Sequence, residues 1–163
     1  MLMANFDEYI RQGEPHKREK GYAWQTAIGL QAVDGLKPSD YLIETARKDI
    51  EGEITIDEAE QLIKSYYQSK EAHTPEDTEM HEADTASTNI RRLLTEKTFA
   101  FTLVGLTSIH RRIFDGIFKF AGQIRDYNIT KKEWVLRGDT VLYVSASDLR
   151  KAIEYDLEQE RQF

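Results

Sequence analysis

The 163-residue chain contains no cysteine, so disulfide bonds and thiolate metal sites are excluded. No apolar run approaches the roughly 18 residues that a membrane-spanning helix needs. The first residues, MLMANFDEYIRQ, carry acid where a secretory signal would carry a basic segment followed by an apolar core. These absences favour a cytoplasmic protein with no membrane partner, and the length predicts one domain with at most a small appended module.

Positive charge is also in short supply. The chain has 22 Lys and Arg against 29 Asp and Glu, which gives a formal net charge of -7. Because affinity for nucleic acid comes mostly from Lys and Arg that neutralise phosphates, this balance argues against a nucleic-acid partner. Short basic pairs such as Arg91-Arg92 are flanked by apolar residues, which is typical of the solvated face of an ordinary element.

Recognised catalytic motifs are missing too. The sequence has no GxxxxGK[ST] or GxGxxG phosphate loop, no GxSxG and no HExxH, so we predict no catalytic residue. The segment from Glu71 to Thr88 combines acids with His73 and His81, side chains that can bind divalent metal. Their spacing matches no known ligand pattern, so we expect a surface loop or a fraying helix end and no metal site.

The sequence does contain helical spacing with clear end signals. Ser39 is placed to cap a helix that Gly52 ends, and Thr55-x-x-Glu58 opens the next one as a capping box. An earlier helix stops at Asp34-Gly35, where the macrodipole disfavours the anion by a few tenths of a kcal/mol. The predicted helices cover residues 23–33, 37–52, 56–70, 85–94 and 98–120, and a last helix starts after Ser145.

A β-hairpin is predicted after Gly122. The runs EWVL (133–136) and TVLYV (140–144) resemble strands and are separated by Arg137-Gly138-Asp139, a glycine-bearing hairpin loop. Ser145-x-x-Asp148 then opens a helix with Leu149, Ile153 and Leu157 on one apolar face. The sequence therefore predicts an all-α fold with one β-hairpin. The exposed edge with Trp134 suits either a docking strand for an extended peptide or a packed lid.

A single histidine interrupts an otherwise apolar stripe of the predicted helix 98–120. No nucleophile or carboxylate partner stands at a recognisable spacing from it. We therefore expect a structural histidine whose ring nitrogens bond a backbone carbonyl or a neighbouring side chain. The stripe consists of Leu103, Leu106, His110, Ile113, Ile117 and Phe120.

The order helix, glycine, hairpin and capped helix resembles the first half of a Fic domain, over about Thr85 to Phe163. In that family the histidine is structural, and the hairpin is a flap that holds a target segment in extended form beside the active site. The flap would span about Asn128 to Val144, with Lys131, Lys132, Glu133 and Trp134 closest to the target. The match is carried by Leu106, Ile109, His110, Ile113, Phe114, Ile117, Phe118, Ala121, Gly122, Arg125, Asn128 and Ile129.

The preceding part resembles the small antitoxin that accompanies some Fic toxins. That antitoxin carries a helix ending in Ser/Thr-x-x-x-Glu-Gly/Asn, whose glutamate pairs with the active-site arginine and blocks productive ATP binding. The aligned residues are Leu30 and Asp34-Gly35, so the hydroxyl is replaced by leucine and the carboxylate is one methylene shorter. The resemblance makes Asp34 the candidate inhibitory carboxylate.

The two resemblances together imply four parts: an N-terminal extension (1–19), an antitoxin-like helical module (20–70), an acidic linker (71–84) and the front of a Fic domain (85–163). Fic enzymes that transfer AMP use His-Pro-Phe-x-Asp/Glu-Gly-Asn-Gly/Lys-Arg, which does not occur here. The resemblance thus implies an incomplete, N-terminal portion of a protein adenylyltransferase, inactive by itself.

For the whole protein, the family implies transfer of AMP from ATP and Mg²⁺ to a Ser, Thr or Tyr hydroxyl of a target protein. We expect neither cofactor to bind this chain tightly, and a homo-oligomer is left open. The alternative is a non-catalytic interaction protein, or an antitoxin acting in trans, that binds a partner through the flap edge and the helical module.

Overall fold

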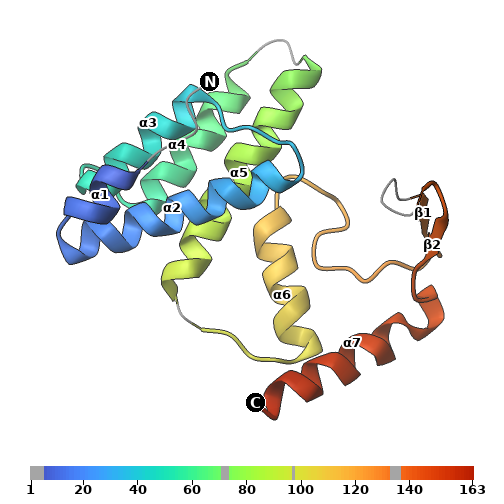
Figure 1. Ribbon diagram of the computed structural model, residues 1–163. Helices are drawn as coiled ribbons and strands as arrows, with labels where there is room; N and C mark the ends of the chain where they lie inside the picture. Colours follow the sequence, from blue (N-terminus) through green and yellow to red (C-terminus); the bar gives the residue numbers. More distant parts are fainter. Residues whose placement is uncertain (1–5, 71–73, 97, 133–136) are drawn as a thin grey trace. The chain divides into compact units, whose positions relative to one another are not determined.

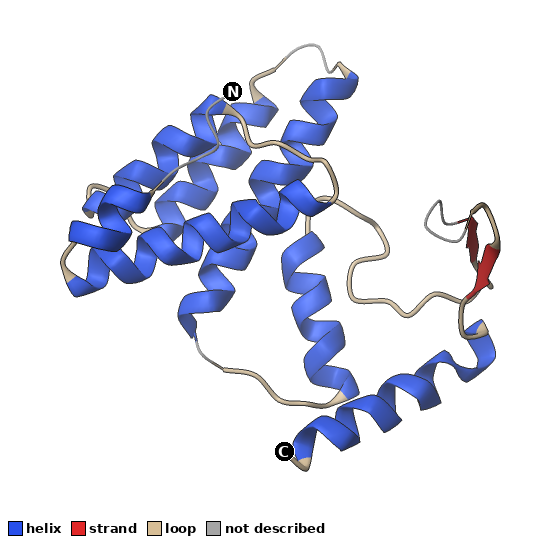
Figure 2. Cartoon of the chain, in the orientation of Figure 1, coloured by secondary structure: helices blue, strands red, loops and turns tan. Residues whose placement is uncertain are grey.

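The computed structural model describes residues 6–70, 74–96, 98–132 and 137–163 (Figure 1). It is mainly helical with one antiparallel hairpin, as the sequence predicts (Figure 2). The chain forms two compact units, Met1–Thr98 with Arg112–Ala121, and Phe99–Arg111 with Gly122–Phe163, called unit 1 and unit 2 below. The elements are α1 (Asp7–Gln12), α2 (Pro15–Val33), α3 (Asp40–Glu51), α4 (Ile56–Gln68), α5 (Pro75–Glu96), α6 (Leu103–Phe114), β1 (Thr130–Lys132), β2 (Thr140–Leu142) and α7 (Ala146–Arg161).

Unit 1 is a helical bundle with an apolar core. Helix α2 packs against α1, α3 and α5, and α4 packs against α3 and α5. The segment expected to be an N-terminal extension contributes to this core, because Phe6 and Tyr9 are both buried. The core cluster consists of Phe6, Tyr9, Trp24, Ile28, Leu42, Ala46, Ile50, Ile63 and Tyr67.

The predicted ends of the first helices are confirmed. The Ser39 hydroxyl accepts from Leu42 N at 3.1 Å, and Gly52 ends α3 in the left-handed region with φ of 81°. At α4, Glu58 N donates to Thr55 Oγ1 at 3.2 Å and Thr55 N donates to Glu58 Oε2 at 2.7 Å, which completes the capping box.

The acidic segment is helical from Pro75 onward, so the predicted loop is wrong there. A capping box that we did not predict starts α5: Asp77 N donates to Thr74 Oγ1 at 3.1 Å, and Thr74 N donates to Asp77 Oδ2 at 3.0 Å. Pro75 suits the first helical position, and Glu76 and Asp77 favour the positive end of the helix. The expected linker 71–84 therefore lies within unit 1, and His73 lies outside the described residues.

A buried carboxylate joins three helices of unit 1. Asp49 of α3 is 1 % exposed, and its Oδ2 accepts from Trp24 Nε1 of α2 at 2.7 Å and from Arg91 Nε of α5 at 2.8 Å. Arg91 Nη2 lies 2.7 Å from the same oxygen. Lys20 adds a donor from α2, with Nζ 2.9 Å from the Asp49 carbonyl. The carboxylate is thus paired and hydrogen-bonded, as burial requires.

A second buried carboxylate fixes the start of α3. Asp84 of α5 accepts from Ser39 N at 2.9 Å, from Ser39 Oγ at 2.5 Å and from Tyr67 OH at 2.5 Å. Burial raises the pKa of Asp84, although the hydrogen bonds from Ser39 and Tyr67 oppose that rise. The same carboxylate therefore anchors a cap of α3 and a tyrosine of α4 to α5.

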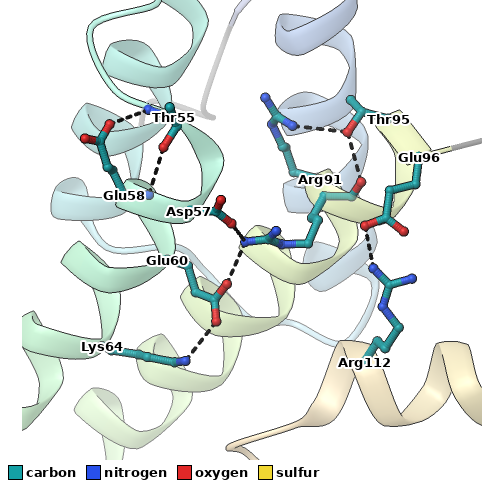
Figure 3. Close-up of polar contacts among 10 residues, drawn as sticks. Thr55, Asp57, Glu58, Glu60, Lys64, Arg91, Thr95, Glu96 and Arg112 are labelled. Atoms are coloured by element: carbon teal, nitrogen blue, oxygen red, sulfur yellow. Dashed lines mark hydrogen bonds and ion pairs between the residues drawn. The ribbon is translucent and has the colours of Figure 1, made fainter.

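Ion pairs that are exposed or partly buried join α4, α5 and the end of α6 (Figure 3). Arg92 Nη2 lies 2.7 Å from both Asp57 Oδ1 and Glu60 Oε2. Arg112 Nη2 lies 2.6 Å from Glu96 Oε1. Because such exposed pairs contribute little each, they align the helices rather than hold the fold.

Helix α6 is shorter than predicted. The sequence predicted a helix from Thr98 to Phe120, but Thr102 caps its start through Gly105 N, 3.0 Å from Thr102 Oγ1. Gly116 adopts φ of 78° and ends it well before Gly122. The predicted buried stripe is also wrong: no residue of α6 is fully buried, and His110 is half-buried.

Unit 2 carries the hairpin and α7. Among the described residues, every fully buried side chain lies between Phe6 and Arg91, so unit 2 contributes none. The predicted apolar face of α7, Leu149, Ile153 and Leu157, is half-buried. No helix within the described ranges is long and apolar enough to cross a membrane.

We expect Asp49→Asn to lower the free energy of unfolding by about 3–5 kcal/mol, because it leaves the buried Arg91 guanidinium without a counter-charge. Urea denaturation followed by circular dichroism measures this loss. Asp57→Asn is the matched control, since Asp57 is exposed and its pair with Arg92 should contribute less than about 1 kcal/mol. Equal losses in the two variants would contradict the central role of Asp49.

The carboxylate of Asp77, which caps α5, should make a pH-dependent contribution to the free energy of unfolding. The hydrogen bond from Lys70, with those from Thr74, lowers the pKa of Asp77 to about 2. Its contribution is therefore complete above the unfolded pKa of about 4 and is lost as the pH falls towards about 2. We expect the difference in urea midpoint between the wild type and Asp77→Asn to be constant from pH 7 to 5 and to shrink below pH 4. A difference that does not change with pH would contradict the assignment.

Candidate functional site

Asp34, the candidate inhibitory carboxylate, ends α2 and is exposed. Gly35 follows with φ of 75°, and its N donates to Ala32 O at 3.0 Å, which closes the helix as the sequence predicted. Burial raises the pKa of Glu82 on α5, and the negative charges of Asp34 and Glu79 add to that rise. The end of α2 is thus an accessible acidic site suited to a cation such as a guanidinium.

Apolar side chains stand next to this carboxylate. Leu30, one turn before Asp34, is 51 % exposed, and Val33 is 82 % exposed. Leu30 occupies the position where the antitoxin pattern has a hydroxyl, so it can pack against a partner but cannot donate a hydrogen bond. The last turn of α2 therefore combines apolar contact surface with one carboxylate.

The hairpin forms within the predicted flap, and its described first strand precedes residues 133–136. β1 is Thr130–Lys132 and pairs with β2, so that Lys131 lies opposite Val141 and Lys132 opposite Thr140. The predicted strand 133–136 lies outside the described residues, and so do the candidate target-binding residues Glu133 and Trp134. Of the four flap candidates, the structure places Lys131 and Lys132 on β1.

Two side chains hold the base of the hairpin. Arg125 Nη1 donates to Tyr127 O at 2.6 Å, and Nη2 donates to Val144 O. Asn128 Oδ1 accepts from Ala146 N at 2.8 Å, which satisfies an amide in the first turn of α7. The bonds from Arg125 to Val144 and from Ala146 to Asn128 join the segment before β1 to the segment after β2. The residue pairs are 18 and 19 positions apart, so no local spacing rule predicts them.

His110 has a structural partner in the backbone, an amide that donates to its ring. Its Nδ1 accepts from Gly122 N at 2.8 Å, which requires an unprotonated Nδ1. Gly122 adopts φ of 77°, and a Cβ at this position would lie 2.7 Å from the Cβ of Arg111. Only glycine therefore fits where the chain turns back against α6 towards the hairpin.

The acidic residues of α5 serve the fold. Asp77 caps the helix and pairs with Lys70, Asp84 bonds Ser39 and Tyr67, and the His81 ring lies 4.4 Å from the Tyr67 ring. In the part of the chain that the structure describes, no group of three or more His, Asp and Glu side chains could hold a metal ion.

The candidate residues fall into two sites, Asp34 in unit 1 and the hairpin in unit 2. No protein-family model matches the chain, and searches of curated proteins and of solved structures also find no match.

We expect Asn128→Ala to loosen the hairpin base, because Ala146 N loses its acceptor. Loss of one hydrogen bond of about 1 kcal/mol should speed amide hydrogen exchange in residues 140–144 about fivefold. Asn128→Asp is the matched control, since it keeps an acceptor oxygen and should exchange as the wild type does. Unchanged exchange in Asn128→Ala would show that this bond does not hold the hairpin.

Proposed function

We propose that this chain is the regulatory and target-presenting front of a Fic-type protein adenylyltransferase that acts in the cytoplasm. In this proposal the hairpin holds a segment of the target protein, and the end of α2 restrains the activity. The chemistry is transfer of AMP from ATP to a Ser, Thr or Tyr hydroxyl, in which the hydroxyl oxygen bonds the α-phosphorus and pyrophosphate leaves.

The observation that carries the proposal is the anchoring of the hairpin. Four residues that carry the resemblance make the bonds that shape this region: His110 bonds Gly122, Arg125 bonds Val144 and Asn128 bonds Ala146. These residues thus have structural roles that do not depend on the resemblance. A hairpin anchored on both sides offers strand edges to which an extended peptide can add.

The position of Asp34 supports the regulatory part of the proposed function. It is exposed, it lies at a helix end where an anion is unfavourable by a few tenths of a kcal/mol, and it is flanked by exposed Leu30 and Val33. Among the described residues of unit 1 the Asp34 side chain has no hydrogen bond or ion pair that offsets this cost. The position of the carboxylate is explained if it pairs with an arginine of the nucleotide site.

ATP and Mg²⁺ are not assigned to this chain. The described residues provide no metal-holding group of His, Asp and Glu, and the sequence contains no phosphate loop. The described residues therefore do not fit a nucleotide-metal site.

The alternative function is a non-catalytic interaction protein or an antitoxin acting in trans. The coding sequence downstream of the codon for Phe163 separates it from the leading proposal. We expect an in-frame His-Pro-Phe motif followed by the acid and glycine-rich turn of the AMP-transferring enzymes. A stop codon at that point would overturn the enzyme-front proposal and favour the alternative.

The regulatory role is tested by adding the chain to a Fic-type enzyme without an inhibitory module, with ATP labelled at the α-phosphate. We expect less AMP transfer, and we expect Asp34→Asn to weaken inhibition about 10- to 100-fold, the equivalent of a charged hydrogen bond of about 1.5–3 kcal/mol. Glu53→Gln removes another exposed carboxylate of unit 1 and should inhibit as the wild type does. Equal inhibition by wild type and Asp34→Asn would remove Asp34 from the mechanism.

A further inference from the structure

One backbone hydrogen bond ties the entry of the hairpin to α6. Gly122 N donates to His110 Nδ1 at 2.8 Å. Within the described residues 122–128, which lead towards the hairpin, no other backbone N–H donates a hydrogen bond. The side chains of Arg125 and Asn128 bond backbone groups after β2, and not α6. The hydrogen-bonded attachment of this segment to α6 therefore depends on one imidazole.

The acceptor of this bond is a group that titrates. A neutral imidazole has one nitrogen that accepts and one that donates, whereas both nitrogens of the protonated ring donate. The Gly122 amide can only donate, so a protonated His110 would set donor against donor. Histidine is also the side chain that ordinarily changes its charge between pH 5 and 8. The bond therefore exists only while His110 is neutral and is lost in acid.

The charged groups at this turn act in the same direction. Arg111 follows His110 on α6, and its Nε would lie 2.9 Å from a Cβ on Gly122. In the segment after Gly122 the charged residues are Arg125, whose guanidinium bonds backbone carbonyls, and Asp126, which is exposed to solvent. A protonated His110 would add positive charge next to Arg111, and like charges repel. Protonation thus weakens the attachment both by removing the bond and by repulsion.

We propose that the bond between His110 and Gly122 is an acid-sensitive latch. It ties the hairpin entry to α6 while the imidazole is neutral and releases it when the ring is protonated. The hairpin itself stays formed, because the bonds of Arg125 and Asn128 use a guanidinium and a neutral amide, which do not titrate in this range. As regulation of target holding the latch rests on the proposed function, but its pH dependence does not.

Hydrogen exchange of the Gly122 amide, followed by NMR of the purified chain from pH 8 to pH 5, tests the latch. Each rate is divided by the intrinsic exchange rate at that pH, which gives a protection factor. We expect the protection factor of Gly122 to fall about fivefold towards pH 5, the equivalent of one hydrogen bond. Core amides of α3, such as those of Ala46 and Ile50, should keep their protection, which shows that unit 1 stays folded.

Two variants at position 110 bracket the wild type. His110→Asn keeps an acceptor oxygen near the place of Nδ1 and does not titrate, so Gly122 should stay protected at every pH. His110→Phe removes the acceptor, so protection should be low at every pH. The wild type should match His110→Asn at pH 8 and His110→Phe at pH 5. His16→Asn is the matched control, because it replaces an exposed histidine of unit 1 and should leave the pH dependence unchanged.

The nitrogen chemical shifts of the His110 ring give an independent readout, since they report directly whether Nδ1 carries a proton. We expect the tautomer with hydrogen on Nε2 at pH 8 and a ring protonated at both nitrogens at pH 5. Circular dichroism shows whether the three variants are folded.

Three outcomes would overturn the proposal. The first is a ring that becomes protonated while the protection of Gly122 does not change. The second is a fall in protection that persists in His110→Asn, which would assign the pH dependence to another group. The third is a ring that stays neutral at pH 5. None of these measurements uses ATP or a target, so a stop codon after Phe163 would count against the enzyme-front proposal and leave the latch unaffected.

Discussion

The buried carboxylate of Asp49 determines how the helices of unit 1 are placed. A charge removed from water needs a close counter-charge and hydrogen-bond donors, and these come from two other helices: Trp24 from α2 and Arg91 from α5. Because the indole and the guanidinium converge on one oxygen, α2 can neither slide along nor rotate against α3 and α5 without breaking a buried bond. The bonds to Asp49 therefore fix the rotational position of α2 about its own axis. This position decides which face of α2 is buried and which face carries the exposed Leu30 and Val33.

Local signals in the sequence predicted the helices whose ends are built from neighbouring residues. Ser39 and the pair Thr55 and Glu58 cap as expected, since their partners lie three residues away. The pair Thr74 and Asp77 carries the same signal, but the acidic composition around it is also typical of a loop. For α6, both Gly116 and Gly122 are possible stops, and Gly116 is the glycine that ends the helix. In both places the sequence contains competing signals, and local spacing alone does not decide between them.

The candidate sites were only partly predictable. The exposure of Asp34 follows from its place at a helix end, before a glycine. The bonds of Arg125 and Asn128 go to backbone groups far along the chain, and sequence spacing carries no information about such partners. The same holds for Ser39 and Asp84, which are 45 residues apart. Long-range polar contacts depend on the packing of whole elements, which a periodic pattern does not specify.

The buried position of Trp24 makes its intrinsic fluorescence a probe of the packing of unit 1. The chain has two tryptophans, and this one is fully buried with its indole N–H bonded to a carboxylate. Its fluorescence therefore responds to any event that moves α2 away from Asp49. With Trp134 replaced by phenylalanine, a single tryptophan, excited at wavelengths that tyrosine does not absorb, would report the packing of α2 against Asp49 in real time. No dye is needed, and no cysteine has to be added to a chain that has none.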